Sequence, residues 1–376
     1  MDFDYVVIPA IILTAGILII WLSIRRLQAL STKSLSRWRK VAERITLCVI
    51  VLVTVAIAGS SSFNAIALHH FWSSHPPAGN FVQVNGHKMH INCTGSGSPT
   101  IILDAQLGND SIWWGEIQPV LSKTTRVCSY DRAGFGWSDP LPAPRDADHI
   151  ADELDQLLLQ AQITGPIILM GHSISGLYLR DYASRYPKNV VGIVLVDVST
   201  PLQDQNPAFK TGSKGPPAWV LRAAMIAGIP RLIGMCSASP HGPNADLWKL
   251  RAEDICRLHY SAMSGELDSF QASGEETVHT GPYGSLPILI ISHDPAKMLA
   301  TPHPTKQDVG RQDAWTQMQE DLKKLSTRSQ RIIAKGSSHN VPIDRAELIE
   351  NKVSLFVEEI RGTAPKPTNY GDTTTE

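Results

Sequence analysis

Hydrophobic residues are distributed along this chain in two distinct ways. The N-terminal part holds two long, almost uninterrupted apolar runs, Tyr5 to Ile24 and Ile45 to about Leu68. Beyond them, apolar residues come in short blocks separated by amphipathic stretches. A run of about 20 apolar residues, at 1.5 Å per helical residue, is long enough to cross a membrane, whereas short blocks build strands and helices around a core. The pattern predicts a membrane anchor over residues 1–72, with transmembrane helices at about 5–24 and 45–68, followed by a folded domain.

The segment between the two apolar runs is strongly basic. Against the single acid Glu43 it carries Arg25, Arg26, Lys33, Arg37, Arg39, Lys40 and Arg44. Loops rich in lysine and arginine stay on the cytoplasmic side of a membrane. The outer ends of both runs then lie on the opposite side, so we expect everything after about Ser73 outside the cytoplasm, in a periplasm or at the outer face of the cell.

A cleaved signal peptide is the alternative interpretation of these runs. The first run is preceded by Met-Asp-Phe-Asp and so lacks the basic start of a signal peptide. The second run has a basic flank and contains Gly59, Ser60 and Ser61 near its end, so cleavage there stays open as an alternative. We expect two retained spans.

The blocks after the anchor alternate between strand and helix patterns. Two alternating runs around Asn85-Gly86 predict a β-hairpin between Phe81 and Asn92. Further strands are expected at 100–104, 126–131, 166–171, 190–197, 286–292 and 330–334. Strands that alternate with helices form a mostly parallel sheet that is covered on both faces. The sequence therefore predicts an α/β fold.

The alternation stops between residues 199 and 285. Proline, glycine and serine are frequent there, and short amphipathic helical pieces take the place of strands. We expect a helical cap over 199–285, inserted between two parts of the core at 73–198 and 286–361. The polar tail, 362–376, repeats proline and threonine and is expected to be disordered.

Charge and cysteine content add two constraints. The formal net charge is −1, which gives no reason to expect a nucleic-acid partner. Cys48 falls in the second apolar run, and the other four cysteines would lie in a compartment that permits disulfides. We favour the pairs Cys93–Cys128, on strands expected to be neighbours, and Cys236–Cys256. Four free buried thiols are the alternative.

One turn of the predicted core carries candidate chemistry. The stretch Gly171-His-Ser-Ile-Ser175 joins a buried strand directly to a helix. Such a turn strains the residue at its apex and needs small neighbours on either side. It lifts the hydroxyl of Ser173 clear of the sheet and places the backbone N–H of Ile174 at the start of the helix, where negative charge is favoured. We predict that Ser173 is a nucleophile.

A serine hydroxyl is a weak nucleophile until a base removes its proton. The chain has 13 histidines, and His339 has the most suitable setting, in a loop of small residues between the last strand and the last helix. An imidazole there can reach over the edge of the sheet. His172 is next to Ser173 in the sequence, but its side chain is expected to point elsewhere and pack near the site.

Together these motifs resemble the α/β-hydrolase superfamily. The resemblance runs from about residue 81 to 360 and rests on the turn around Ser173, on Tyr130-Asp-Arg-Ala-Gly-Phe-Gly-Trp-Ser-Asp139 and on Gly336-Ser-Ser-His339. It implies the α/β-hydrolase fold, with an eight-stranded, mostly parallel sheet, helices on both faces and a helical cap. It also implies that nucleophile, acid and histidine follow one another in that order along the chain.

The resemblance implies an oxyanion hole made of two backbone N–H groups. They correspond to Ile174 and Gln106 in this sequence. Most relatives carry His-Gly before the second donor, where this chain has Asp104-Ala105, so Leu107 is an alternative to Gln106.

Two positions match sites where relatives carry the acid. Asp197 closes the sixth strand, whereas Asp294 lies two residues before the position that follows the seventh strand in many relatives, which is Ala296 here. We favour Asp197 and keep Asp294 as the alternative. Each also has an ordinary interpretation, Asp197 as a loop cap and Asp294 as a turn residue.

The resemblance implies acyl transfer to water, with His339 deprotonating Ser173. Serine at the apex argues against the epoxide hydrolases and haloalkane dehalogenases, which use a carboxylate there. We expect a membrane-anchored serine hydrolase that cleaves carboxylic esters, with amides as the less favoured alternative, and that acts on a small ester or lipid-like substrate. The sequence has no metal-ligand spacing such as His-Glu-x-x-His, and we expect no cofactor. The alternative is a non-catalytic ligand-binding or sensory protein on the same fold.

Overall fold

The computed structural model describes residues 3–32, 34–142, 144–210, 218–237, 244–257, 259–300 and 302–363. The chain forms two compact units. The N-terminal unit comprises Met1–Pro76 and Gly215–Tyr260, and the sheet unit comprises Pro77–Lys214 and Ser261–Glu376. The expected disordered tail lies, from residue 364 onward, outside the described residues.

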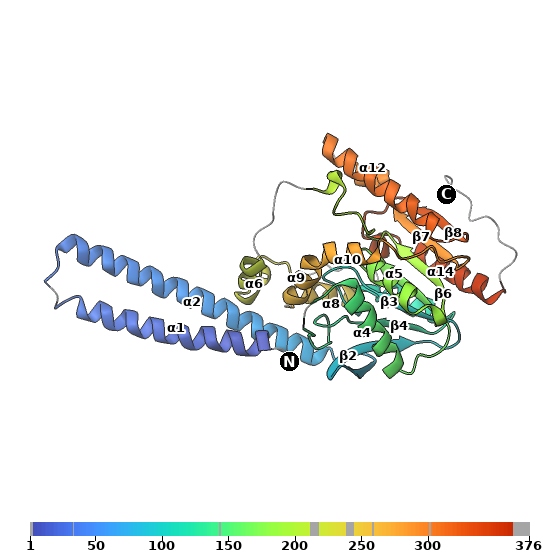
Figure 1. Ribbon diagram of the computed structural model, residues 1–376. Coiled ribbons are helices and arrows are strands. Elements are labelled where there is room, and N and C mark those ends of the chain that lie inside the picture. The colour runs from blue at the N-terminus through green and yellow to red at the C-terminus, as the bar shows by residue number, and fades with distance from the viewer. Residues whose placement is uncertain are drawn as a thin grey trace. The chain divides into compact units, whose positions relative to one another are not determined.

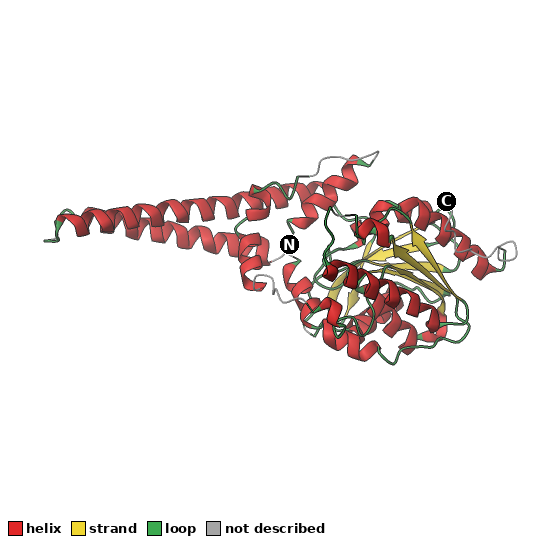
Figure 2. Cartoon of the chain, turned by 90° about the horizontal axis from the view of Figure 1, so that it is seen from above, coloured by secondary structure: helices red, strands yellow, loops and turns green. Residues whose placement is uncertain are grey.

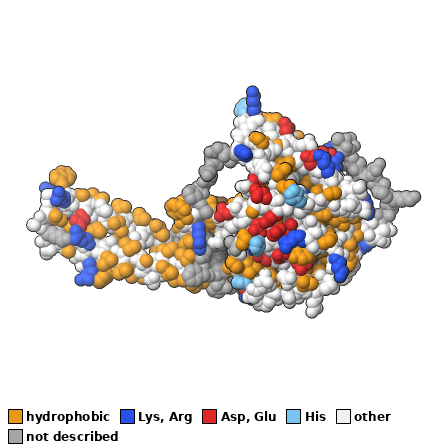
Figure 3. All heavy atoms as spheres, in the orientation of Figure 1, with side chains coloured by type: hydrophobic (Ala, Val, Ile, Leu, Met, Phe, Trp, Pro, Cys, Tyr) orange, Lys and Arg blue, Asp and Glu red, His pale blue; other side chains and the backbone are white. Residues whose placement is uncertain are grey.

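The N-terminal unit is built on two long helices, α1 (Phe3–Ala29) and α2 (Arg37–Ser74). Both are long and apolar enough to cross a membrane. Hydrophobic side chains lie along their length, and lysines and arginines gather at the end where the two helices are joined (Figure 3). Helix α1 includes Arg25 and Arg26 and helix α2 includes Arg37 to Arg44, so most of the basic segment that we expected to be a loop is helical. Arg26 of α1 forms an ion pair with Glu43 there, so the basic segment is tied to the first helix.

The two helices approach each other closely at Gly16. A Cβ atom at this position would lie 3.3 Å from Thr54 and 3.5 Å from Ala58, both on α2. Small residues at a contact let helix backbones come near each other without a hydrophobic driving force, as between membrane helices. The contact explains why a glycine is tolerated inside α1, where it weakens a helix.

Part of the expected cap belongs to the N-terminal unit. Helices α6 (Ala218–Ile226), α7 (Ile229–Leu232) and α8 (Ala245–Ile255) lie in it. Arg231 donates to Asn64 of α2 at 2.8 Å and pairs with Glu253 of α8 at 2.6 Å. The expected cap region is thus divided, since residues 199–214 and 261–285 belong to the sheet unit.

The sheet unit contains one eight-stranded sheet in the order β1-β2-β4-β3-β5-β6-β7-β8. β1 and β2 pair antiparallel, β2 pairs antiparallel with β4, and all other neighbours are parallel. The strands are Asn80–Val84, His87–Thr94, Thr100–Asp104, Val127–Tyr130, Ile167–His172, Val190–Val196, Ile288–His293 and Ser329–Ala334. The predicted eight-stranded, mostly parallel sheet is confirmed.

Helices cover both faces of this sheet (Figure 1; Figure 2). Successive residues of a strand point to opposite faces, and in β5 Ile167 and Leu169 pack into one core while Ile168 and Met170 pack into the other. Because both faces of the central strands are buried, these strands are continuous apolar blocks in the sequence. The helical segments of the unit are η1 (Ser111–Trp114), α3 (Ile117–Leu121), α4 (Ala147–Gln160), α5 (Ser175–Arg185), η2 (Pro187–Asn189), η3 (Pro207–Phe209), α9 (Tyr260–Asp268), α10 (Phe270–Thr277), α11 (Pro295–Met298), α12 (Lys306–Asp321), η4 (Leu322–Leu325), α13 (Val341–Asp344) and α14 (Ala346–Arg361).

Both favoured disulfides are present. Cys93 of β2 and Cys128 of β4 are directly opposite each other in the sheet and are bonded. Cys236 and Cys256 are bonded within the N-terminal unit. Cys48 on α2 is free, as expected from its place in the apolar run.

A buried ion cluster connects the end of the sheet to α9. The guanidinium of Arg132 lies 2.7 and 3.0 Å from the two carboxylate oxygens of Glu266, and 2.6 Å from Asp104 at the end of β3. All three side chains are almost completely buried. Burial raises the pKa of Asp104 to about 6, although Arg132 limits the rise. Glu266, with two hydrogen bonds, is therefore the main counter-charge of Arg132.

We predict that Glu266→Gln destabilises the protein. Removing one partner of a buried ion pair leaves the other charge unpaired, at a cost of about 3 kcal/mol, the low end of the usual range because Asp104 remains. Urea unfolding of the full chain followed by tryptophan fluorescence measures this loss. The matched control is Glu275→Gln, an exposed position on α10. Equal stability of the two variants would contradict the prediction.

Candidate active site

The candidate residues gather at the carboxyl ends of four adjacent parallel strands. Ser173 follows β5, Asp197 follows β6, His293 ends β7, and His339 lies in the loop after β8. The carboxyl ends of parallel strands meet at one edge of a sheet, which is where α/β folds place their ligands. The topology thus brings together residues that are far apart in the sequence.

Ser173 occupies the strained apex of the strand-to-helix turn. Its φ angle is +59°, in the left-handed region that residues other than glycine rarely adopt. The turn is tight, since a Cβ atom at Gly171 would lie 2.7 Å from the hydroxyl oxygen of Ser175. Glycine is therefore required two residues before Ser173, and the predicted small-residue turn is present.

Ser175, where relatives usually have glycine, fastens this turn to the neighbouring strand. Its hydroxyl lies 2.7 Å from the carbonyl oxygen of His172 and 3.1 Å from that of Asp104, which ends β3. The side chain is completely buried. The departure from glycine thus adds one hydrogen bond within the Ser173 turn and one between this turn and the end of β3, which leads to Gln106.

A continuous series of hydrogen bonds connects Ser173, His339 and Asp197. Nε2 of His339 lies 3.0 Å from Oγ of Ser173, and Nδ1 of His339 lies 2.6 Å from Oδ2 of Asp197. Asp294 is engaged elsewhere, because its carboxylate accepts from the backbone N–H groups of Ala296 and Gly336. Of the two candidate acids, the structure brings Asp197 to His339.

The Asp197 carboxylate is buried and accepts four hydrogen bonds. Oδ2 accepts from His339 and, at 2.7 Å, from Nδ1 of His293. Oδ1 accepts from the backbone N–H of His293 at 3.1 Å and from Nε1 of Trp315 on α12 at 2.9 Å. Burial by itself raises the pKa of Asp197, but the hydrogen bonds from His293 and His339 outweigh it and hold the pKa well below its usual range. Asp197 is therefore ionised at neutral pH.

His293 is a member of this site that the sequence analysis did not identify. Its Nε2 atom lies 3.0 Å from Oε1 of Gln312 on α12, on the side opposite Asp197. Burial lowers the pKa of His293, but the hydrogen bond and charge of Asp197 more than compensate, so the pKa is raised. The sequence did contain a signal for His293, since this histidine directly follows a predicted apolar strand and so lies at the same sheet edge as Asp197.

His172 packs beside the site, as expected from its position. Its ring stacks on Trp113 at a centroid distance of 5.5 Å, and Nε2 lies 2.8 Å from the backbone carbonyl oxygen of His339. Burial lowers the pKa of His172 to about 3. This imidazole is therefore neutral and supports the His339 loop through a hydrogen bond.

The two residues expected to donate backbone N–H groups lie in neighbouring turns. Ile174 is the first residue after Ser173 and precedes α5. Gln106 lies in the turn after β3, where its carbonyl oxygen accepts from Arg132 at 3.2 Å and from the backbone N–H of Asn109 at 3.2 Å. Leu107, the alternative donor, packs against the buried cluster that contains Ile174. The Arg132 cluster thus also holds the Gln106 turn.

A pocket of about 420 Å³ opens beside Ser173. Its volume is within the range of small-molecule sites. The lining combines apolar side chains with a few polar and charged ones: Ser173, Ser199, Gln203, Phe209, His293, Met298, Leu299, Asp308, Arg311, Gln312, Trp315 and His339. Such a lining suits a largely apolar ligand that has a polar reacting group.

Asp197, His293 and His339 are grouped closely enough to be considered as metal ligands. Their ligand atoms lie within 4.8 Å of one another. However, the Nδ1 atoms of both imidazoles lie at hydrogen-bonding distance from the same carboxylate oxygen. Hydrogen bonding therefore accounts for the grouping.

Comparison with known proteins gives partial sequence matches. The family described as alpha/beta hydrolase fold matches residues 99–231. An uncharacterised protein of Schizosaccharomyces pombe is 41% identical over 85 residues, which cover 23% of this chain and 16% of that protein. The human (lyso)-N-acylphosphatidylethanolamine lipase is 29% identical over 151 residues, covering 39% of this chain and 43% of the lipase. The chain thus spans less than half the length of these two relatives.

Solved structures match a larger share of the chain than the sequence comparisons do. An esterase from Exiguobacterium antarcticum superposes with a TM-score of 0.56 at 16% identity, covering 74% of this chain and 99% of the esterase. At this identity the likeness concerns the fold. Together with the sheet order, the Ser173 turn and the family match over residues 99–231, it shows that the chain has the α/β-hydrolase fold.

Proposed function

We propose that the protein is a membrane-anchored serine hydrolase that cleaves carboxylic esters through an acyl-enzyme on Ser173. The observation that carries the proposal is the hydrogen-bonded series from Ser173 through His339 to Asp197. It has the order and the contacts of a nucleophile, a general base and an acid that orients the base. The match of residues 99–231, which include Ser173, to the alpha/beta hydrolase fold family supports hydrolytic chemistry at this site.

In this mechanism His339 removes the proton of Ser173 as its oxygen attacks the substrate carbonyl. The bond between Nδ1 of His339 and Asp197 keeps the proton on Nδ1, so Nε2 is free to act as the base. The ionised Asp197 then stabilises the imidazolium that forms. His339 returns the proton to the leaving group, and a water molecule activated by the same imidazole releases the acyl group.

The backbone N–H groups of Ile174 and Gln106 stabilise the negative charge that develops on the carbonyl oxygen. Ile174 precedes α5, whose N-terminus favours negative charge. The hydrogen bond from Arg132 to the Gln106 carbonyl fixes the second donor's turn before the substrate arrives. A preorganised donor of this kind contributes about 2.7–4 kcal/mol to transition-state stabilisation.

The proposed substrate class is a small ester or a lipid-like ester. The pocket beside Ser173 offers Phe209, Met298, Leu299 and Trp315 to an apolar acyl chain. Two apolar helices long enough to cross a membrane would hold the enzyme at a lipid surface. The names of the human lipase and of the Exiguobacterium esterase agree with this class of substrate.

The first prediction from the proposed function concerns the nucleophile. A fluorophosphonate probe should label the purified full chain, and Ser173→Ala should abolish labelling and lower esterase kcat by about 10⁶-fold, because no other group can form the acyl-enzyme. Gel fluorescence and p-nitrophenyl ester hydrolysis measure the two effects. Ser122→Ala, on the surface at the end of α3, is the control and should label normally. Absence of labelling in the unmodified protein would instead support a non-catalytic binding protein.

The second prediction concerns the acid. Asp197→Asn should lower kcat by about 10⁴-fold, because the amide no longer fixes the His339 tautomer or stabilises its positive charge. Asp294→Asn, which changes a turn residue of the same type, should leave kcat within about threefold of the unmodified value, since surface substitutions have small effects. An equal loss in both variants, or a larger loss for Asp294→Asn, would refute the assignment of Asp197.

The pKa of His293 provides a readout that does not depend on activity for the two variants Asp197→Asn and Asp294→Asn. Its pKa is raised because Asp197 favours the imidazolium more than burial opposes it. In Asp197→Asn the carboxylate charge is lost, while burial and the charge of Arg331 still lower the pKa and only the Gln312 hydrogen bond raises it, so the pKa of His293 should fall from its value in the unmodified protein. Imidazole NMR titration measures the shift. Asp294→Asn should leave the pKa of His293 unchanged.

The third prediction concerns the side of the membrane. Because the basic residues gather at the joined ends of the two helices, the sheet unit is proposed to face away from the cytoplasm, in a periplasm or at the outer cell face. A reporter that folds only outside the cytoplasm, fused after Ser73, should be active. The same reporter fused in the segment that joins α1 to α2 should be inactive. The opposite pattern would reverse the orientation.

A further inference from the structure

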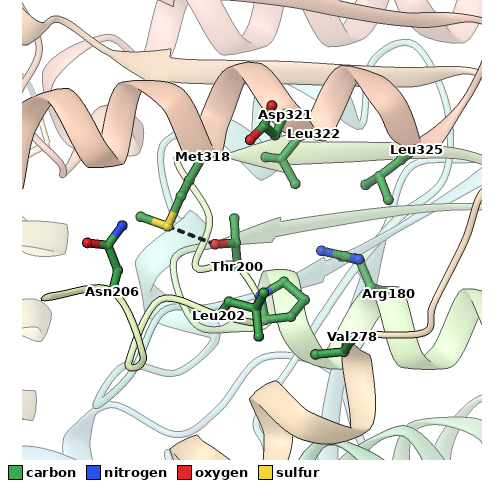
Figure 4. A pocket seen from close by; sticks show the side chains of 10 residues that line it. Arg180, Thr200, Leu202, Asn206, Val278, Met318, Asp321, Leu322 and Leu325 are labelled. Carbon is green, nitrogen blue, oxygen red and sulfur yellow. Dashed lines mark hydrogen bonds between the residues drawn. The ribbon is translucent and has the colours of Figure 1, made fainter.

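A second pocket of about 290 Å³ lies in the sheet unit (Figure 4). Its walls come from α5, from the segment after β6, from the end of α10, and from α12 with η4. Most of its lining is apolar, with Leu202, Val278, Leu322 and Leu325 around it. One cation, Arg180 of α5, extends among these side chains (Figure 4).

The Arg180 side chain is buried without a carboxylate partner among the described residues. It is 5% exposed. Nε donates to the hydroxyl of Thr280 at 3.2 Å, and Nη2 lies 3.4 and 3.3 Å from the carbonyl oxygens of Thr277 and Thr280. All of these partners are neutral oxygens. Burial lowers the pKa of Arg180 from its usual value, although Tyr283 opposes the shift.

A buried guanidinium without a counter-charge is costly, because ions in a protein interior are normally paired. Asp321 also lines the pocket, but it is bonded to Lys324 at 2.6 Å and to Gln317 at 3.1 Å. Its side chain is 45% exposed. Asp321 is therefore neutralised at the surface and does not serve as the counter-charge of Arg180.

We propose that this pocket binds a small carboxylate that carries a short hydrocarbon chain. The carboxylate would pair with the side of the Arg180 guanidinium that faces the pocket, since its planar donors match two carboxylate oxygens. The hydrocarbon chain would lie against Leu202, Leu322 and Leu325. The ligand supplies the charge that the pocket lacks, and its chain fills the apolar remainder.

This pocket shares a wall with the pocket beside Ser173. In the segment after β6, Thr200, Leu202 and Asn206 line the second pocket, while Ser199, Gln203 and Phe209 line the first. An acid with a hydrocarbon chain is also the class of product that ester cleavage releases. This link to catalysis rests on the proposed function, whereas ligand binding to the second pocket does not.

Isothermal titration of the full-length Ser173→Ala variant in lipid nanodiscs, with empty nanodiscs as the blank, tests the proposal without any turnover. Hexanoate should bind at least about tenfold more tightly than hexan-1-ol, which lacks the charge, or acetate, which lacks the chain. Adding Arg180→Gln should weaken hexanoate binding at least about tenfold, because the charge-assisted bonds are lost.

A second variant covers the case in which Arg180→Gln fails to fold. Leu202 is 51% exposed and lines the pocket, so Leu202→Trp can fill the pocket while keeping the bonds of Arg180. Leu159→Trp, at a position on α4 that is 52% exposed, is the matched control and should bind hexanoate normally.

Three results would overturn the proposal. One is the absence of hexanoate binding. Another is unchanged binding in Leu202→Trp or in a folded Arg180→Gln variant. The third is binding that is lost only in Arg311→Gln, which would place the ligand in the pocket beside Ser173. Because Ser173 is already replaced, these results do not depend on whether the protein is an esterase.

Discussion

The candidate active site depends on one buried carboxylate, that of Asp197, and on the donors that surround it. Two imidazoles, one indole and one backbone N–H donate to its two oxygens. These donors come from β7, α12 and the loop after β8, so the carboxylate connects three parts of the sheet edge. They also keep Asp197 ionised despite its burial. An ionised acid at this position is what a histidine base needs in order to hold its proton on Nδ1 and to accept a second one.

The same edge of the sheet is stabilised from the side of the nucleophile. A hydrogen bond from Ser175 connects the Ser173 turn to the end of β3. Arg132 forms hydrogen bonds to Gln106, in the turn after β3, and to Glu266 on α9. Strained backbone angles at Ser173 and Asp197 persist only where surrounding contacts determine them. The buried ion cluster and the Asp197 hydrogen bonds supply such contacts on either side of Ser173. The site is thus organised before any substrate is present.

The sequence predicted those features that depend on local patterns. Apolar blocks bounded by turns predicted all eight strands, and the small residues around Ser173 predicted its tight turn. The division of the cap depends on contacts such as that of Arg231 with Asn64, which join residues distant in the sequence. His293 was missed for a similar reason, since only the pairing of β6 with β7 brings it to Asp197. The catalytic roles of Ser173, His339 and Asp197 remain predictions.

The central claim is that an acyl group forms a covalent bond with Ser173 during ester cleavage. The most direct measurement is mass spectrometry of protein that is acid-quenched during turnover of a p-nitrophenyl ester, followed by proteolysis. We expect an acyl mass increment on the peptide that contains Ser173, and a larger adduct fraction when deacylation is slowed. Ester cleavage without any adduct, or with the adduct on another residue, would contradict the claim.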